Sequence, residues 1–326
     1  MKSEVFNQST CIVSTVAYQY YVEKKSRAEI TEELGLSSAT ISRLLKKAKE
    51  DGIVEFRITE PYFSCHKMEE QLKEMYDLDN VMIVPVIEKE AKENSETIKK
   101  LVALEGARYV QRIITDGDVL GLTWGGTMYH MIQYLNPCRK VNASIVTMHG
   151  SIASCNPKLE VKSLVRRAAM AFGGRNVSFV APGLFDSKEE LERIKKQPKF
   201  QEIFSMFEEI DISVSGIGSL YPKFDSLLAR SDFFSREEME MLIKEEAYTD
   251  LLLRYINKDG EECDTPLRDR TLSISLDTYR RIPCKVIAAS GSQKAYSLLA
   301  MLKGKLINVL IIDSHLAEAV LRLSEN

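Results

Sequence analysis

Two short turns in the sequence carry the side chains that could bind an anion. In the first turn, Gly125, Gly126 and Thr127 follow an apolar run and open a helical pattern. In the second, the polar residues 290–292 precede Lys294, again where a helical pattern begins. Helix-start N–H groups, a hydroxyl and an ammonium are groups that hold phosphate. We therefore predict a phosphate cradle, although such glycines also serve packing alone and neither turn matches a nucleotide-binding fingerprint.

A second set of side chains could contact DNA. Residues 38–50 have the period of a helix, with an apolar stripe on one face and cations on the other, and residues 37–49 contain no acidic residue. Arg43 can bind a guanine edge through two hydrogen bonds, and the small residues before it permit close approach. The lysines that follow suit backbone phosphates. The predicted DNA-binding residues are Ser37, Ser38, Ala39, Thr40, Ser42, Arg43, Lys46 and Lys47.

The elements that would position this helix are also visible. Ser26 and Glu29 have the spacing of a capping box, Gly35 supplies a tight turn, and Ser37 can cap the second helix. Residues 8–24 supply a third amphipathic helix, and residues 53–58 alternate like the strand of a wing. The pattern predicts a winged helix-turn-helix. The alternative is a helical hairpin with a solvated basic face that contacts proteins and shows no salt-dependent DNA binding.

Length and composition limit the class of protein. The chain has 326 residues, 44% hydrophobic and 28% charged, with a net charge of −3. DNA affinity must therefore come from a local basic patch, and it should depend strongly on salt. The six cysteines contain no Cys-x-x-Cys pair, which indicates free thiols in a reducing compartment. Because no signal segment or membrane-length apolar run is visible, we expect a cytoplasmic protein.

The rest of the chain has the pattern of an α/β domain. We place the boundary at Thr59, with residues 1–59 binding DNA and residues 60–326 binding an effector and forming oligomers. Val- and Ile-rich runs that alternate with helical periods predict a doubly wound parallel sheet, which binds ligands beyond the carboxyl ends of its strands. The expected strands lie at 81–87, 117–124, 143–150, 176–182, 211–219, 284–291 and 307–313, and the expected helices at 66–78, 126–135, 161–172, 199–210, 293–304 and 315–323.

The ordered set of motifs resembles the SorC-type family of bacterial transcriptional regulators. LGLSSATISRLLKKAKEDGIVEFRI resembles the DNA-reading helix and wing of that family, and GDVLGLTWGGT its strand-turn-helix signature. The later blocks that match in order are FVAPGLF, ISVSGIGS, VIAASGSQKA and LINVLIIDSHLAEAVL. The resemblance implies an effector domain like ribose-phosphate isomerases and CoA-transferases, a tetramer or dimer on operator DNA, and a phosphorylated sugar as effector.

The resemblance also implies which residues would bind the effector. The Gly-Gly-Thr turn and Lys294 match the family directly, whereas Asp250 matches an acidic block in which the glycines of the family are replaced here. His149 stands where some relatives carry a cation, in one branch a Schiff-base lysine, so we expect non-covalent binding; a purely structural role is the alternative. Arg230 is a further phosphate candidate. The predicted effector-binding residues are Gly125, Gly126, Thr127, His149, Arg230, Asp250 and Lys294.

These observations predict a transcriptional regulator, most simply a repressor of a sugar or nucleoside catabolic operon, with no cofactor and no catalytic residues. The rival is a sugar-phosphate isomerase or transferase with an accessory DNA-binding domain. The four histidines lack metal-ligand spacing, and no acid–base cluster is evident. His315 follows Asp313 after a strand, which could suggest acid–base work, but we expect this pair only to begin the last helix.

Overall fold

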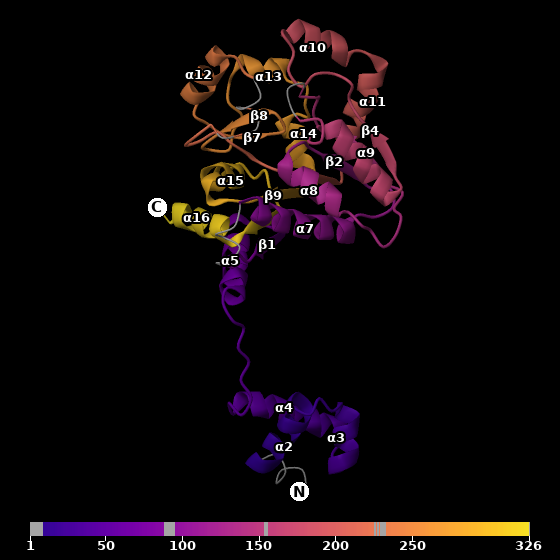
Figure 1. Cartoon of the computed structure of the whole chain (residues 1–326), viewed down its shortest axis with the longest axis vertical. Helices are drawn as coiled ribbons and strands as arrows, with labels where there is room; N and C mark the ends of the chain where they lie inside the picture. Colours follow the sequence, from indigo (N-terminus) through magenta and orange to yellow (C-terminus); the bar gives the residue numbers. More distant parts are fainter. Residues whose placement is uncertain are drawn as a thin grey trace. The chain divides into compact units, whose positions relative to one another are not determined.

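The structure, a computed structural model, describes residues 9–87, 95–152, 156–224, 226, 228 and 233–325. The chain divides into two compact units, Met1–Thr59 and Glu60–Asn326. Figure 1 labels most of their helices and strands. Each unit has a hydrophobic core of its own, so we describe the two units separately.

The described part of the first unit contains three helices: α2 (Thr10–Tyr21), α3 (Arg27–Leu34) and α4 (Ser38–Glu50). Their apolar faces meet in a small core that includes Val16, Ile30 and Leu44, each fully buried. The predicted stripe of α4 is the buried face of that helix, because Ile41, Leu44, Leu45 and Ala48 are its buried residues. Burial of this stripe leaves the basic face of α4 toward solvent.

Local hydrogen bonds fix the starts of α3 and α4 as predicted. The Ser26 hydroxyl accepts from the Glu29 N–H at 3.3 Å, and the Glu29 carboxylate accepts from the Ser26 N–H at 2.7 Å, which completes the capping box. Gly35 ends α3 in the left-handed region with φ 62°. The Ser37 hydroxyl then accepts from the Thr40 N–H at 3.1 Å and caps α4.

The strand predicted over residues 53–58 is not formed. The Val54 N–H donates to the Ala48 carbonyl at 3.0 Å, and the Val54 side chain packs on the core of the first unit. Phe56 and Ile58 are 65% and 59% exposed. Apolar alternation yields a strand only where another strand satisfies its backbone groups, and the described part of this unit contains no such partner.

In the described part of the second unit, seven strands form one sheet in which every neighbouring pair is parallel. This confirms the predicted parallel sheet. Their order is β1 (Asn80–Val84), β10 (Val309–Asp313), β9 (Cys284–Ala289), β5 (Ile212–Ser215), β2 (Val119–Leu122), β3 (Ser144–Thr147) and β4 (Arg175–Val177).

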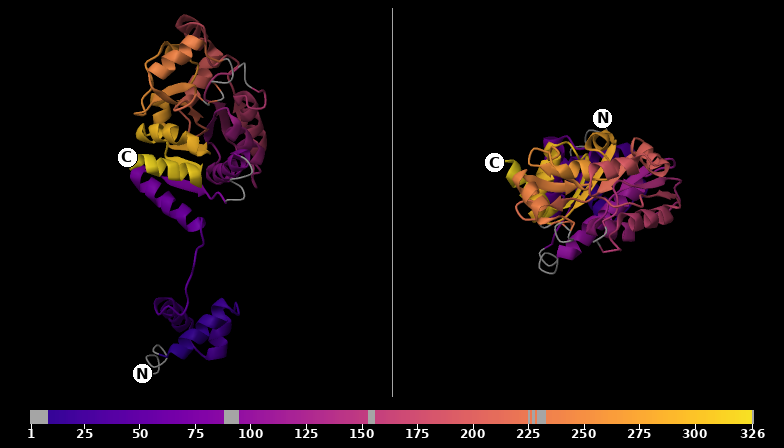
Figure 2. Two further views of the ribbon diagram at one scale, coloured as in Figure 1. Left: turned by 60° about the vertical axis from the view of Figure 1, so that its left-hand side comes forward. Right: turned by 90° about the horizontal axis from the view of Figure 1, so that it is seen from above.

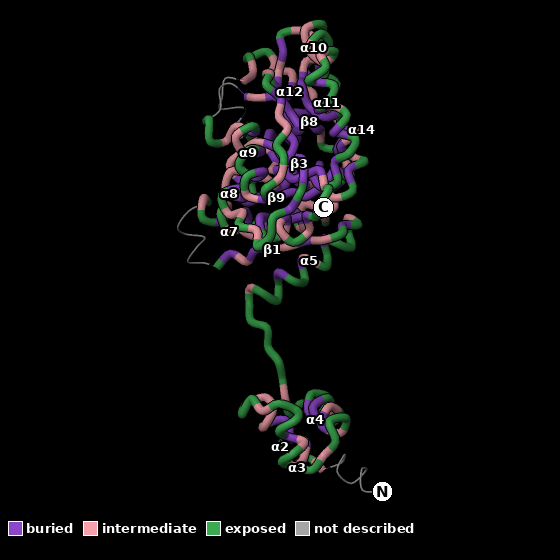
Figure 3. The backbone as a smooth tube through the Cα atoms, turned by 90° about the vertical axis from the view of Figure 1, so that its right-hand side faces the viewer, coloured by how far each residue is buried: buried purple, intermediate pink, exposed green. Residues whose placement is uncertain are grey.

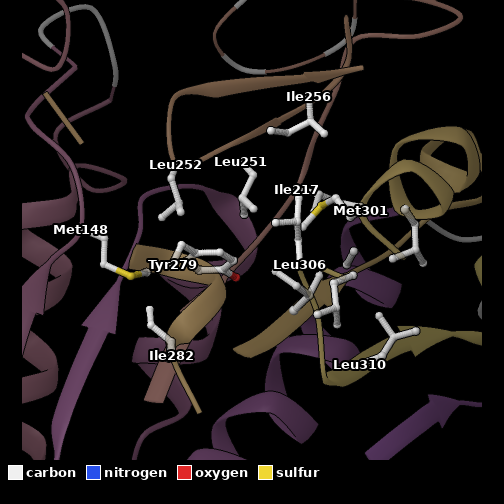
Figure 4. Close-up of a cluster of buried hydrophobic side chains, with 14 of the residues drawn as sticks. Met148, Ile217, Leu251, Leu252, Ile256, Tyr279, Ile282, Met301, Leu306 and Leu310 are labelled. Carbon is white, nitrogen blue, oxygen red and sulfur yellow. The ribbon is translucent and has the colours of Figure 1, made fainter. Parts of the chain in front are cut away.

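Helices cover both faces of this sheet. Along β10, Leu310 and Ile312 belong to one core and Val309 and Ile311 to the other, as the two-residue period of a strand requires. Figure 3 shows the buried backbone gathered in these strands, and Figure 4 shows part of the first core around Leu310. The first core receives α5 (Tyr62–Tyr76), α10 (Lys188–Lys195), α11 (Pro198–Phe207), α15 (Ala295–Lys303) and α16 (Ser314–Ser324); the second receives α7 (Ser95–Ile113), α8 (Gly126–Tyr134) and α9 (Val161–Phe172).

A second, antiparallel sheet was not predicted. It consists of β6 (Gly218–Ser219), β7 (Ala247–Leu251) and β8 (Arg254–Asn257), with α12 (Arg236–Lys244), α13 (Pro266–Arg270) and α14 (Leu276–Arg281) in the same part of the chain. The helices α15 and α16 lie side by side. Figures 1 and 2 show β7 and β8 on the side of α15 that is away from α16. The sheet matters because Asp250 of β7 pairs with Gly218 of β6, so β7 brings a carboxyl group to a strand that follows β5.

Candidate functional site

A cavity of about 320 Å³ lies at the carboxyl ends of the parallel strands. Thr123 follows β2, Ser215 ends β5 and Ser290 follows β9, and all three line the cavity. The Thr123 hydroxyl donates to the Ser215 hydroxyl at 3.1 Å, which supplies a polar floor. The volume is within the range of small-ligand pockets, and the position is the expected one for this sheet type.

The first predicted turn forms one wall of this cavity. Gly125 has φ 121°, a conformation that L side chains rarely adopt, and α8 starts at Gly126. Thr127, in the first turn of α8, is 6% exposed and lines the cavity. A Cβ atom on Gly126 would lie 3.8 Å from the Lys99 Nζ. The turn therefore combines a helix start, a hydroxyl and an ammonium.

The second predicted turn lines the same cavity. Gly291 has φ 95°, and its N–H donates to the buried Asp313 carboxylate at 2.6 Å. A short 3₁₀ turn, Ser292–Lys294, leads into α15. Burial, together with the nearby Lys99 ammonium, lowers the pKa of Lys294 to about 8. The ammonium groups of Lys99 and Lys294 therefore lie near each other and near the starts of α8 and α15. This arrangement favours the binding of an anion.

Asp250 supplies a different kind of group to the cavity. Its side chain is 6% exposed, and among the described residues its Oδ1 atom has no hydrogen-bond partner. Burial raises the pKa of this carboxyl to about 7, opposed by a hydrogen bond from the Leu253 backbone. Gly218 lies directly against this carboxyl, because a Cβ atom on this glycine would be only 3.0 Å from Asp250 Oδ2 and 3.3 Å from the Ser226 Cβ. A buried carboxyl oxygen with spare hydrogen-bonding capacity suits a ligand hydroxyl.

The raised pKa of Asp250 predicts how the stability of the protein depends on pH. The unfolded chain releases the Asp250 proton near the ordinary pKa of 3.8, whereas the folded protein keeps it up to about pH 7. The free energy of unfolding therefore falls as pH rises between these values. An asparagine cannot ionise, so the variant Asp250→Asn escapes this loss. Its free energy of unfolding relative to the wild type should therefore rise by about 2–3 kcal/mol when the pH is raised from about 5 to about 8. Urea unfolding at both pH values measures this difference.

The matched control is Asp259→Asn, which removes a carboxylate from an exposed position. We expect its stability difference from the wild type to stay nearly constant across the same pH range. If Asp250→Asn and the wild type lost stability in parallel, a buried, protonated Asp250 would be ruled out.

His149 lies outside the cavity lining, unlike the contact predicted from the sequence. It is fully buried beyond the end of β3, and its Nδ1 lies 2.8 Å from the Gly150 carbonyl, to which it donates. Its Nε2 accepts from the Trp124 N–H at 3.2 Å. Burial lowers its pKa to about 4, so the neutral imidazole holds the Trp124 backbone in place. Both ring nitrogens are used within the protein, which matches the structural alternative.

The remaining predicted site residues separate into two groups. Gly125, Gly126, Thr127, Asp250 and Lys294 all line the one cavity, whereas Arg230 lies outside the described residues. Sequence reasoning did not find Lys99, because no helix was predicted over residues 95–113. In the structure Lys99 lies in the second turn of α7 (Ser95–Ile113).

His315 and Asp313 do not form an acid–base pair. The Asp313 carboxylate caps α16 by accepting from the His315 and Leu316 N–H groups at 3.0 and 3.1 Å. The His315 side chain points to a separate environment, since it is exposed while Asp313 is fully buried. The expectation that this pair begins the last helix is confirmed. Within the described ranges, no cluster of residues could hold a metal ion.

The predicted DNA-binding residues share one helix and its cap. Arg43 and Lys46 are exposed on α4, opposite its buried stripe, and Ser37, Ser38 and Ala39 are exposed at its start. Thr40, Ser42 and Lys47 are partly buried. Lys47 pairs with Asp51 at 3.0 Å and Lys46 with Glu50 at 3.6 Å. These exposed i,i+4 pairs are weak and leave both lysines available to phosphates.

Comparison with known proteins assigns the family. Residues 60–322 match the Sugar-bind model, which describes a sugar-binding domain, and residues 24–55 match a winged helix-turn-helix DNA-binding model. The full-length sorbitol operon regulator SorC from Klebsiella pneumoniae superposes with a TM-score of 0.74 at 26% identity, covering 96% of this chain and 99% of that one. The chain belongs to the SorC-type family of transcriptional regulators. Its likeness to SorC extends through both units of the chain.

A second relative is the deoxyribonucleoside regulator of Bacillus subtilis (strain 168). It is 29% identical to this SorC-type regulator over 303 residues, which cover 92% of this chain and 94% of the relative. Both relatives are transcriptional regulators rather than enzymes, which confirms the prediction that this chain is a regulator and not an enzyme. The predicted fold class is confirmed as well. Of the described helices, none has the length and apolar content needed to cross a membrane.

Proposed function

We propose that this SorC-type regulator represses a sugar or nucleoside catabolic operon and is released from its operator by a phosphorylated sugar. The named relatives support the operon class, since one is a deoxyribonucleoside regulator and another a sorbitol operon regulator. The exposed basic face of α4 supports binding in the major groove.

One observation carries the proposal for the effector. A single cavity combines an anion-favouring wall, formed by Thr127, Lys294 and the Gly125-Gly126 turn, with the buried carboxyl of Asp250. The first set of groups suits a phosphate, and a carboxyl accepts hydrogen bonds from sugar hydroxyls. A phosphorylated sugar carries both kinds of group, whereas a free sugar has no anion to place against this wall.

The mechanism we propose is a shift between two arrangements of a homo-oligomer, a tetramer or a dimer. One arrangement matches spaced half-sites on the operator, and the effector binds the other more tightly. The coupling between cavity and DNA is reciprocal and typically about 1–3 kcal/mol per site. Several coupled subunits would make the response steep.

A thermal-shift screen of phosphorylated sugars tests this proposal. A true effector at about one hundred times its Kd should stabilise the protein by about 2.7 kcal/mol. The matched control for each compound is the same sugar without its phosphate, which we expect to have little effect. A free sugar that stabilised the protein as strongly as its phosphate ester would contradict the proposed effector class.

A further inference from the structure

Lys99 lines the cavity but lies outside the two turns predicted from the sequence. It belongs to α7, and its side chain is 32% exposed. Its Nζ atom lies close to the start of α8, 3.8 Å from the position that a Cβ atom on Gly126 would take. It is also close enough to Lys294 for the two ammonium groups to repel each other, which contributes to the lowered pKa of Lys294.

A carboxylate holds the Lys99 ammonium in this place. Glu96 lies one helical turn earlier on α7, and its Oε2 atom is 2.7 Å from the Lys99 Nζ. Its other oxygen, Oε1, is 2.6 Å from the His130 Nε2 on α8. The Lys99 ammonium and, to a smaller degree, His130 lower the pKa of Glu96. Glu96 therefore bridges two packed helices and stays ionised beside the cavity.

This arrangement is not explained by stability alone. A partly exposed i,i+3 ion pair contributes only modestly to folding. The Lys99 and Lys294 ammonium groups repel each other, although Glu96 pairs with Lys99 and the Asp313 carboxylate favours the charged form of Lys294. An anionic ligand in the cavity would reduce the remaining repulsion. The two lysines instead match the charge of a phosphate monoester, which carries about −1.5 to −2 near neutral pH.

We infer that Lys99 is the second phosphate-binding cation of the cavity, and that Glu96 neutralises it until a phosphate monoester competes for the same ammonium. This inference rests on the proposed function and adds the specificity for a doubly charged group. A singly charged ligand would gain too little from Lys294 to displace Glu96 from Lys99.

The single tryptophan of the chain, Trp124, lines the cavity and reports its occupancy by fluorescence. We would titrate the full-length protein with inorganic phosphate and compare the wild type with Lys99→Gln, Glu96→Gln and Lys294→Gln. Lys100→Gln is the control, because it removes the same charge from an exposed neighbour on α7.

The inference predicts that Lys99→Gln and Glu96→Gln change the affinity for phosphate in opposite directions. Lys99→Gln should weaken phosphate binding about 10- to 100-fold, as expected for a lost hydrogen bond to a charged group. Glu96→Gln should tighten binding by about threefold or more, because it removes a competing negative charge. Lys100→Gln should bind as the wild type does. A merely structural role for the pair would weaken binding in both variants.

Three results would contradict the account, and each would overturn a different part of it. If Lys294→Gln lost phosphate while Lys99→Gln bound it as tightly as Lys100→Gln, the role of Lys99 would be refuted and the proposed function would stand. If Glu96→Gln weakened binding or left it unchanged, the competition by Glu96 would be refuted. If the wild type gave no saturable response to phosphate, the phosphorylated effector itself would be refuted.

Discussion

Replacing Lys294 with alanine should raise the effector concentration needed for release from operator DNA by about 10- to 100-fold, while leaving DNA affinity unchanged. The Lys294 ammonium lines the cavity beside the start of α15, and its lowered pKa of about 8 leaves it mainly protonated at neutral pH. Its loss removes a charge-assisted hydrogen bond to phosphate and should weaken effector binding by about 10- to 100-fold. Operator release measured against effector concentration, in gel shifts of both proteins, gives this shift directly. Release at the wild-type concentration would contradict the assignment.

Thr127 provides the internal control for this prediction. If Thr127 and Lys294 hold the same phosphate, Thr127→Val and Lys294→Ala should be non-additive in a double-mutant cycle of effector affinity, with an interaction energy of about 0.5–3 kcal/mol. Simple additivity would argue that the two turns hold different groups of the ligand, although both line one cavity.

Arg43→Ala should weaken binding to the preferred operator by about 1–3 kcal/mol and relax the base preference. Arg43 is exposed on α4, one turn after the exposed Ala39 and on the same face as that residue. The measurement is fluorescence anisotropy with the operator and with single-base variants of it. Equal losses on every sequence would assign Arg43 to phosphate contacts instead of base reading.

Lys46→Ala is the matched control for Arg43→Ala. Lys46 is exposed one turn further along α4 and pairs only weakly with Glu50, at 3.6 Å. Its loss should weaken binding to all sequences alike and should reduce the slope of log affinity against log salt by about 1. Unchanged salt dependence would show that Lys46 faces away from the duplex.

The sequence carried most of the information about the elements and the two turns. Hydrophobic periods located the strands of the parallel sheet because both of its faces are buried and its strands are therefore nearly continuous apolar runs. They also located α5, α8, α9, α11, α15 and α16, but the 19-residue α7 was not predicted. Caps such as Ser26 and Ser37 are local hydrogen-bonded motifs, so sequence reading finds them without knowledge of the fold.

Features that depend on long-range contacts were missed or misplaced. The predicted strand over 211–219 is split between β5 and β6, which belong to different sheets. Residues 53–58 alternate but have no partner strand in the described part of their unit. The role of His149 is decided by the Trp124 N–H, which is distant in sequence. Lys99 reaches the cavity only because α7 packs on α8. Periodicity reports which face of an element is buried, and it does not report what that face meets.

The coupling between the effector cavity and DNA binding is tested most directly by the affinity of the full-length protein for a promoter fragment of its own operon. This affinity is measured with and without a phosphorylated sugar that stabilises the protein. We predict tight, salt-sensitive binding that the sugar phosphate weakens in the wild type but, at the same concentration, much less in Lys294→Ala. An affinity that stayed the same with saturating sugar phosphate would contradict the coupling between the cavity and α4 on which the account depends.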